Sequence, residues 1–281
     1  MNFGSHVSIR NGYLGAAKYA LQIGAACFQY FPKNPRSLNV KQWSEKDASS
    51  CAQFCKDHRL VSISHAPYPT NVSEADKEMR QVILQSLKND LEITDACGSI
   101  GLVVHFGKYK GSDSIEGYKL MIDMLNQLLL NWQGKALVLI ENNAGQGVRM
   151  GTTFEELVQI RKLCDKSEQI GFCLDTCHAF ASGLWGGENW SSIAIKGEKL
   201  GYFENLKAVH LNDSAYPYES YRDRHANIGR GFIGEVNMRE FLQSHSIQGI
   251  PKILETPTTS DYTHKEEIEY VNQMVLKNAL E

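Results

Sequence analysis

Seven short segments of this chain carry a histidine or a carboxylate, most of them where an apolar run ends. They are residues 64–67, 104–105, 140–143, 174–178, 209–213, 223–225 and 254–257. Five of the nine histidines and at least four carboxylates lie in them, far apart in the sequence. Imidazole and carboxylate groups are common ligands of catalytic Zn²⁺ and Mn²⁺, and more than one ion is needed to use so many of them. If the fold brings these segments together, they predict a multi-metal hydrolytic site.

Single residues in these segments also have simpler interpretations. A lone histidine is more often structural than a ligand. Asp175 is placed to cap a helix that starts after its strand, and Asp223 beside Arg224 is typical of a surface ion pair. Glu141 and Glu255 differ, because each follows a strongly apolar run and an ionised glutamate there is costly unless it is paired or bound to metal. We therefore expect metal-binding or catalytic roles for these two glutamates.

Short runs rich in branched and aromatic residues alternate with longer amphipathic segments along the chain. Strands are expected at residues 2–8, 27–30, 61–66, 101–105, 136–141, 171–175, 208–212 and 253–255. Helices are expected at residues 13–23, 44–57, 74–96, 114–131, 153–166, 190–199, 237–244 and 265–278. This alternation predicts an α/β fold, a (β/α)8 TIM barrel, in which the C-terminal ends of all strands meet at one mouth.

A doubly wound open sheet is the alternative fold. An open sheet concentrates its site at one switch point, whereas the candidate ligands here follow six or seven strands. The loops richest in Gly, Pro, Ser and Asn mostly follow strands as well, which is the functional side of a barrel: residues 31–39, 66–73, 142–152, 181–189 and 213–234. We therefore expect one barrel domain over residues 1–281, with the metal cluster at the C-terminal face of its strands.

The totals are those of an ordinary globular protein, with 281 residues, 42% hydrophobic and 22% charged. A formal net charge of −3 gives no general attraction to nucleic acid or membranes, so DNA binding would need local basic patches. Seven scattered cysteines without a CxxC motif indicate reduced core thiols, and only Cys177, between two candidate ligands, is a minor candidate for metal contact. The sequence has no signal-peptide pattern and no long apolar stretch, which predicts a cytoplasmic protein that does not enter membranes.

Other catalytic motifs are absent or incomplete. The glycines of Gly145-Gln146-Gly147 do not fit the dinucleotide pattern GxGxxG, and we find no Walker A loop, GxSxG elbow or kinase motif. Basic and aromatic residues do occur on the loops after strands: Lys33, Arg36, Lys41, Tyr68, Lys108, Tyr109, Lys110, Arg149, Arg222, Arg224 and Arg230. They are either ordinary solvated charge or groups for phosphate contact and base wedging.

Three longer blocks make the sequence similar to a known family. They are residues 140–147 (IENNAGQG), residues 174–183 (LDTCHAFASG), and residues 210–214 (HLNDS) followed by 223–229 (DRHANIG). With these blocks, and along essentially the whole chain from Gly4 to Pro257, the sequence resembles the endonuclease IV family of apurinic/apyrimidinic (AP) endonucleases, within the xylose isomerase-like barrels. Ordered blocks of this length are more specific than any single spacing.

The resemblance implies nine metal ligands and three Zn²⁺ ions per chain, with Mn²⁺ as an alternative occupant of one site. His65 and His105 would hold the first ion. Asp175, His210 and Glu255 would hold the second ion, and Glu141 would bridge the first and the second. The third ion would be held by His178, Asp223 and His225. It also implies hydrolysis of DNA on the 5′ side of abasic sites in base-excision repair, leaving a 3′-hydroxyl and a 5′-deoxyribose phosphate, together with 3′-end cleaning. Glu141 and Glu255 are then the catalytic candidates, Arg36 and Tyr68 are the candidate DNA contacts, and a monomer is expected.

The chain departs from the family pattern in the loops expected to grip DNA. Tyr68 is kept, but Pro69 stands where the family commonly has leucine. Ala215 and Glu219-Ser220-Tyr221 stand where the family usually has a lysine and Gly-Ser-Arg. Losing two cations and gaining a carboxylate predicts weaker contact with phosphates.

Two other functions compete with the AP endonuclease. A sugar or sugar-phosphate isomerase on the same barrel needs fewer metals and would use the paired Glu141 and Glu255. A non-catalytic nucleic-acid-binding relic would not need an intact ligand set. The trio His178, Asp223 and His225 discriminates, because an isomerase has little use for it.

Overall fold

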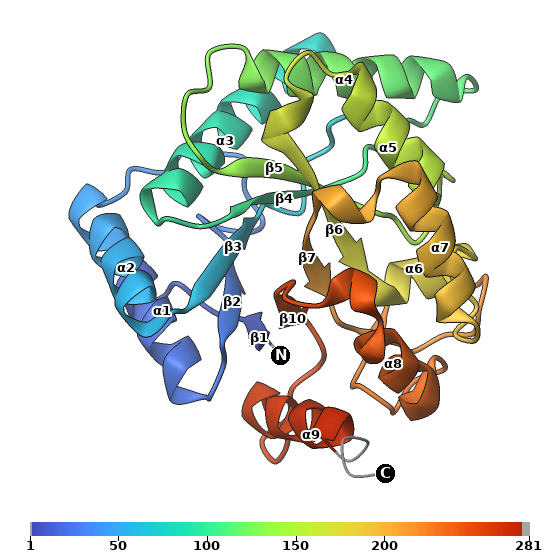
Figure 1. Cartoon of the computed structure of the whole chain (residues 1–281). Coiled ribbons are helices and arrows are strands. Elements are labelled where there is room, and N and C mark those ends of the chain that lie inside the picture. The colour runs from blue at the N-terminus through green and yellow to red at the C-terminus, as the bar shows by residue number, and fades with distance from the viewer. Residues whose placement is uncertain (1, 277–281) are drawn as a thin grey trace.

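Eight parallel strands form a closed barrel that a ring of helices surrounds (Figure 1). The computed structural model describes residues 2–276. Around the barrel the strands follow in the order β1, β2, β3, β4, β5, β6, β7 and β10, and β10 pairs with β1 to close the ring. The expected TIM-barrel fold is therefore confirmed, and the open sheet is excluded.

The barrel elements lie close to their expected positions. The strands are β1 Phe3–His6, β2 Cys27–Tyr30, β3 Val61–His65, β4 Gly101–His105, β5 Leu137–Glu141, β6 Ile170–Asp175, β7 Leu206–His210 and β10 Lys252–Leu254. The helices around them are α1 Gly12–Gln22, α2 Glu45–His58, α3 Lys77–Ala96, α4 Ser114–Leu129, α5 Phe154–Leu163, α7 Trp190–Leu200, α8 Gly234–Gln243 and α9 His264–Leu276. The last two residues of the helix expected at 265–278 lie outside the described residues.

Several short elements have no counterpart among the expected ones. They are helix α6 Thr176–Ser182, the hairpin strands β8 Asp213–Ser214 and β9 His225–Ala226, and the 3₁₀ helices η1 Ser167–Gln169, η2 Phe203–Asn205 and η3 His245–Ile247. Helix α6 and the β8–β9 hairpin both begin beyond the C-terminal ends of barrel strands, on the side of the mouth.

Local side chains explain where helices begin. The Thr153 hydroxyl accepts a hydrogen bond from the Glu156 backbone N–H, and the Glu156 carboxylate accepts one from the Thr153 N–H, which is a complete capping box for α5. Asp175 caps α6 in the same way, by accepting from the backbone N–H of His178. The capping interpretation of Asp175 is therefore correct, and it does not exclude a second role for the other carboxylate oxygen.

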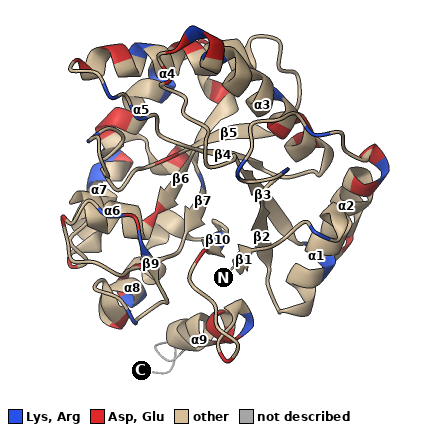
Figure 2. Ribbon diagram, turned by 180° about the vertical axis from the view of Figure 1, so that it is seen from behind, with Lys and Arg blue, Asp and Glu red and all other residues tan. Residues whose placement is uncertain are grey.

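One layer of small and apolar side chains fills the barrel interior. Seven strands each contribute one fully buried residue to it: Cys27, Ile63, Val103, Leu139, Cys173, Ala208 and Ile253. A larger apolar core lies between the strands and the helices, while charged residues lie mainly on the outer faces of the helices and in loops (Figure 2). All seven cysteines are buried and free. None of the helices in residues 2–276 is long and apolar enough to cross a membrane.

Candidate metal centre

A polar layer lies one step above the apolar layer of the barrel. Side chains two residues apart on a strand point to the same face, so the residues two positions after the apolar layer also point inward, at the C-terminal mouth. They are Gln29, His65, His105, Glu141, Asp175, His210 and Glu255. Six of these seven are candidate metal ligands, which explains how segments far apart in sequence converge at one place.

Register between neighbouring strands sets which ligands meet. His105 pairs with Glu141 across β4 and β5, and Asp175 pairs with His210 across β6 and β7. The other three candidates come from the short elements above the barrel, with His178 on the first turn of α6 and two residues at the β8–β9 hairpin, Asp223 and His225. The nine ligand candidates thus converge on the mouth from six barrel strands and two short elements.

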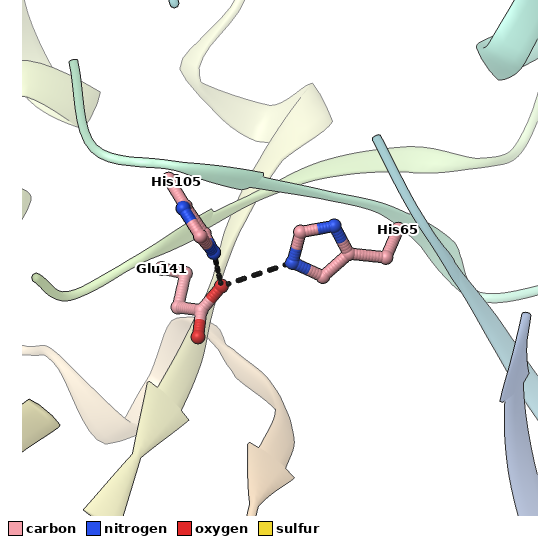
Figure 3. A group of neighbouring side chains, drawn as sticks. All are labelled: His65, His105 and Glu141. Atoms are coloured by element: carbon pink, nitrogen blue, oxygen red, sulfur yellow. Dashed lines mark hydrogen bonds and ion pairs between the residues drawn. The ribbon is translucent and has the colours of Figure 1, made fainter. Parts of the chain in front are cut away.

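The first group consists of His65, His105 and Glu141 (Figure 3). The Nε2 atoms of His65 and His105 lie 3.3 and 3.2 Å from Oε2 of Glu141. The Nδ1 of His65 lies 2.7 Å from the Ala66 carbonyl, which accepts its proton and leaves Nε2 as a lone-pair donor toward Glu141. Glu141 and His65 are almost completely buried, while His105 is partly exposed to the pocket.

The second group shares Glu141 with the first and adds Asp175, His210 and Glu255. The Nδ1 atom of His210 lies 2.9 Å from Oε1 of Glu141 and 3.3 Å from Oε2 of Glu255. Glu141 therefore directs one carboxylate oxygen to each group, which is the arrangement expected of a bridging ligand.

The third group is the trio His178, Asp223 and His225. The Nε2 atoms of the two histidines lie 3.2 and 3.4 Å from the same Oδ1 of Asp223. Both Nε2 atoms are buried, and neither makes a hydrogen bond to any residue in the described part of the chain. Two buried nitrogens and a carboxylate oxygen directed at one point fit a divalent cation, because a bound ion would supply the partner that both nitrogens lack.

The electrostatics of the cluster favour bound cations. Burial disfavours the charge of Glu255, but His210 outweighs it and lowers the pKa of this carboxyl to about 2. Burial also disfavours a charged His225, yet Asp223 raises the pKa of this imidazole to about 9. Glu255, like Glu141 and Asp223, whose pKa values are also lowered, is thus ionised near neutral pH and attracts positive charge, either protons on the imidazoles or metal ions that replace them.

Three residues that the sequence patterns did not single out as ligands support the cluster. Gln29 donates from Nε2 to Oε1 of Glu255 at 2.6 Å, and its Oε1 lies 2.7 Å from Nε2 of His210. Asn212 donates to Oδ2 of Asp175 at 2.8 Å, and the Asn142 carbonyl lies 2.8 Å from Nδ1 of His178. These contacts fix ring orientation and tautomer so that the other ring nitrogen faces the cluster.

The pocket above the cluster has a volume of about 360 Å³. Candidate ligands form its floor, and Phe31, Tyr68, His6 and His264 complete its wall. His6 continues the polar layer on β1, where its Nδ1 lies 3.1 Å from Nε2 of Gln29, and burial lowers its pKa to about 4. It is therefore a neutral imidazole at neutral pH.

The two candidate DNA contacts lie together at the rim. The backbone N–H of Tyr68 donates to the Pro35 carbonyl at 2.8 Å, which ties its loop to the one that carries the exposed Arg36. The Tyr68 ring is 65% exposed and meets the Phe31 ring edge-on at 5.1 Å. Both side chains thus point to solvent beside the pocket.

Cys177 also lies near candidate ligands, in a group with Asp175 and His225. Burial raises the pKa of its thiol well above the ordinary value. Its Sγ lies 3.5 Å from the Arg224 carbonyl, whereas both Nε2 atoms of the trio with Asp223 lack a hydrogen-bond partner within residues 2–276, so the trio is the better third site.

A parallel eight-stranded barrel with imidazoles and carboxylates gathered at its C-terminal mouth defines the class of metal-binding TIM barrels. The family model for xylose isomerase-like TIM barrels matches residues 17–274. A protein named probable endonuclease 4 from Symbiobacterium thermophilum is 40% identical over 98% of this chain and 100% of its own length. Endonuclease IV from Thermus thermophilus has the same fold, with a TM-score of 0.87, 27% identity and coverage of 99% of this chain and 100% of that one.

The chain belongs to the endonuclease IV family within the xylose isomerase-like TIM barrels. A D-tagatose 3-epimerase-like protein shares the fold as well, with a TM-score of 0.70 and 19% identity over 99% of this chain and 100% of that one. At this identity the likeness concerns the fold alone.

Proposed function

We propose that this protein is a metal-dependent AP endonuclease of base-excision repair. It hydrolyses the phosphodiester on the 5′ side of an abasic site in double-stranded DNA and leaves a 3′-hydroxyl and a 5′-deoxyribose phosphate. Full-length similarity to proteins named endonuclease 4 supports this activity. The observation that carries it is the grouping of nine donor residues into three adjoining sets, two of which share Glu141.

Each set has the donors of a divalent cation site, and we assign one Zn²⁺ to each, with Mn²⁺ as an alternative in one of them. The ligands are His65, His105 and Glu141; Glu141, Asp175, His210 and Glu255; and His178, Asp223 and His225. Bound divalent cations would supply Lewis-acid activation of water and would neutralise charge on the phosphate and on the departing 3′-oxygen.

The chain's own residues position the reacting groups. Glu141 lies between two sets and is placed to orient the attacking water. Glu255 stays ionised, and Gln29 holds its Oε1 so that its Oε2 faces His210. Arg36 and Tyr68 at the rim meet the DNA, the first at a phosphate and the second, with its exposed ring, against the helix where a base is missing. A single catalytic domain over residues 1–281, acting as a cytoplasmic monomer, is part of this proposal.

A sugar or sugar-phosphate isomerase is the second candidate. A pocket of about 360 Å³, which is large enough for a small ligand, favours it. The trio His178, Asp223 and His225 argues against it, because proton transfer between carbon atoms of a sugar gives this additional set no role.

The test is incision of a duplex oligonucleotide that carries one tetrahydrofuran abasic analogue, at low salt, with the metal content measured on the same sample. We expect cleavage 5′ to the lesion and about three divalent ions per chain, enough to occupy the three sets. A fully metallated protein that leaves the duplex intact would overturn the proposal. Isomerisation of a sugar phosphate by that same sample would establish the second candidate.

A further inference from the structure

Three exposed arginines at the mouth each place the guanidinium over a tyrosine ring. The Arg–Tyr pairs are Arg149–Tyr221, Arg222–Tyr216 and Arg230–Tyr262, with distances from guanidinium carbon to ring centroid of 4.1, 4.6 and 4.0 Å. All three tyrosines are partly buried. These distances are within the range of cation–π attraction, so each ring holds its arginine in place at the surface.

The Arg–Tyr pairs share one side of the barrel mouth. Arg149 lies on the loop after β5, Arg222 on the β8–β9 loop after β7, and Tyr262 on the loop after β10. Blue segments beside β9 mark part of this basic surface in Figure 2. In the closed barrel, two strands separate β5 from β2 in one direction and two separate β7 from β2 in the other, and Arg36 follows β2. Exposed arginines thus occur on strand-end loops on both sides of the mouth.

The three guanidinium groups have unused hydrogen-bond donors. Within residues 2–276 none of the three guanidinium groups makes a hydrogen bond or an ion pair, and each has a cation–π contact with a tyrosine ring. A ring covers a face of the guanidinium and leaves the N–H groups at its edge free. Phosphate oxygens accept from two such N–H groups at once, which makes phosphate a fitting ligand for all three.

Arg149 is the best placed of the three, because its pair adjoins the third ligand set. Tyr221 precedes Asp223 by two positions, and the Asp223 backbone N–H donates to Oε1 of Gln146 at 3.2 Å. The Tyr221 ring packs over Gly145, where φ is +82° and an added Cβ would lie 2.8 Å from the ring. The backbone N–H of Tyr221 also donates to the Ala181 carbonyl at 3.0 Å. The loop of Arg149 and the hairpin of Asp223 therefore form one unit.

We propose that the Arg–Tyr pairs bind the backbone phosphates of the DNA duplex on the side of the pocket opposite Arg36. This inference rests on the proposed nuclease function and adds the surface that carries its substrate. With a net charge of −3, the chain attracts DNA through local cations only. Each tyrosine acts through its arginine, by holding the guanidinium in the orientation that phosphate needs.

The test compares the wild-type enzyme with Arg149→Ala, Tyr221→Ala and Tyr221→Phe in binding to an intact duplex without a lesion, which reports phosphate contact alone. Binding is measured from roughly 50 to 200 mM KCl. Arg149→Ala should weaken binding several-fold. It should also reduce the slope of log Kd against log salt by the amount expected for the loss of about one phosphate contact. The matched control is Lys135→Ala, which removes an exposed cation from the loop before β5, at the opposite end of the barrel, and should leave the slope unchanged.

The tyrosine variants separate positioning from a merely structural role. Tyr221→Phe keeps the ring and should bind as the wild type does. Tyr221→Ala should weaken binding, and the double variant with Arg149→Ala should be no weaker than Arg149→Ala alone. On the abasic duplex, Arg149→Ala should raise KM while kcat and the metal content stay unchanged.

Two outcomes would overturn the proposal, and they differ in whether the nuclease function also fails. If the wild type incises abasic DNA but Arg149→Ala matches Lys135→Ala in salt slope and in KM, the phosphate contact is refuted and the nuclease function stands. If the wild type neither binds nor incises DNA, the proposed function and this inference fail together.

Discussion

Individual residues in the cluster divide into those that provide donor atoms and those that orient them. Glu141 provides one oxygen to each of two ligand sets. Glu255 is held by Gln29 through one oxygen while the other faces His210. The sequence marked these two glutamates as candidate ligands, because a glutamate that ends an apolar run needs a partner, and the structure places both beside histidines. Gln29 was missed, since a glutamine carries no charge to mark it, although its place in the period-two pattern of β2 could have revealed it.

Replacing Glu255 with glutamine should separate catalysis from binding. The amide keeps the shape of the side chain and removes its charge, so turnover on the abasic duplex should fall by at least about 100-fold, whereas affinity for an intact duplex should change little. Single-turnover incision and fluorescence anisotropy measure the two quantities. Glu168→Gln, the same change at an exposed position before β6, serves as the control. Equal losses of turnover and affinity would instead mean that Glu255 has a structural role.

Loops after strands are the elements that hold the site in place, and buried polar anchors fix them. Asp213 accepts backbone N–H groups from five residues, Ser214, Gly229, Gly231, Ile233 and Gly234, and so fixes the chain on both sides of His225. The loop between β2 and α2, which carries Arg36, is anchored on α3. There Lys33 lies 3.1 Å from Asp90, and the Lys41 backbone N–H donates to Asn89 at 2.8 Å.

The anchor at Asp90 should make stability depend on pH. Burial raises the pKa of this carboxyl to about 7, although the ammonium groups of Lys33 and Lys41 oppose the shift. The pKa of Asp90 is higher in the folded state than in the unfolded state, so the folded state binds its proton more tightly. The free energy of unfolding should therefore fall as pH rises from about 4 to about 7.

Asp90→Asn should remove this contribution and give a flatter profile between about pH 5 and pH 7, measured by urea unfolding of wild type and variant. Asp123→Asn, a change at a carboxylate that is 56% exposed, should keep the wild-type profile. If Asp90→Asn has the same pH profile as the wild type, the carboxyl is not the titrating group.

At the scale of the whole molecule, the sequence predicted the architecture better than the details of the mouth. Strand ends such as His105 and Glu141 were placed correctly. Short apolar runs that alternate with amphipathic helices are typical of a parallel (β/α)8 barrel, and each run then marks one barrel strand. Helix α6 and the β8–β9 hairpin were not foreseen, since elements of seven and two residues are too short to show periodicity. Yet these elements carry His178, Asp223 and His225.

Chelation should affect the whole molecule and not the mouth alone. The candidate ligands belong to six of the eight barrel strands, and without ions the ionised carboxylates of Glu141 and Glu255 would lie close together at the mouth. We expect EDTA treatment to abolish incision and to lower the melting temperature, and added Zn²⁺ to restore both. Calorimetry with and without chelator measures the shift. An unchanged melting temperature in a sample shown to be metal-free would contradict a link between the ions and the fold.

The closing of the barrel by β10 has a consequence for the time at which the protein becomes active during synthesis. Glu255 follows β10, the last of the barrel strands to be made, whereas His65 ends β3. The ribosome therefore releases this last candidate ligand only after all eight barrel strands have been made. A nascent or truncated chain has isolated histidines but lacks the complete second set. A nuclease assembled in this order cannot cut DNA before its last barrel strand has been translated.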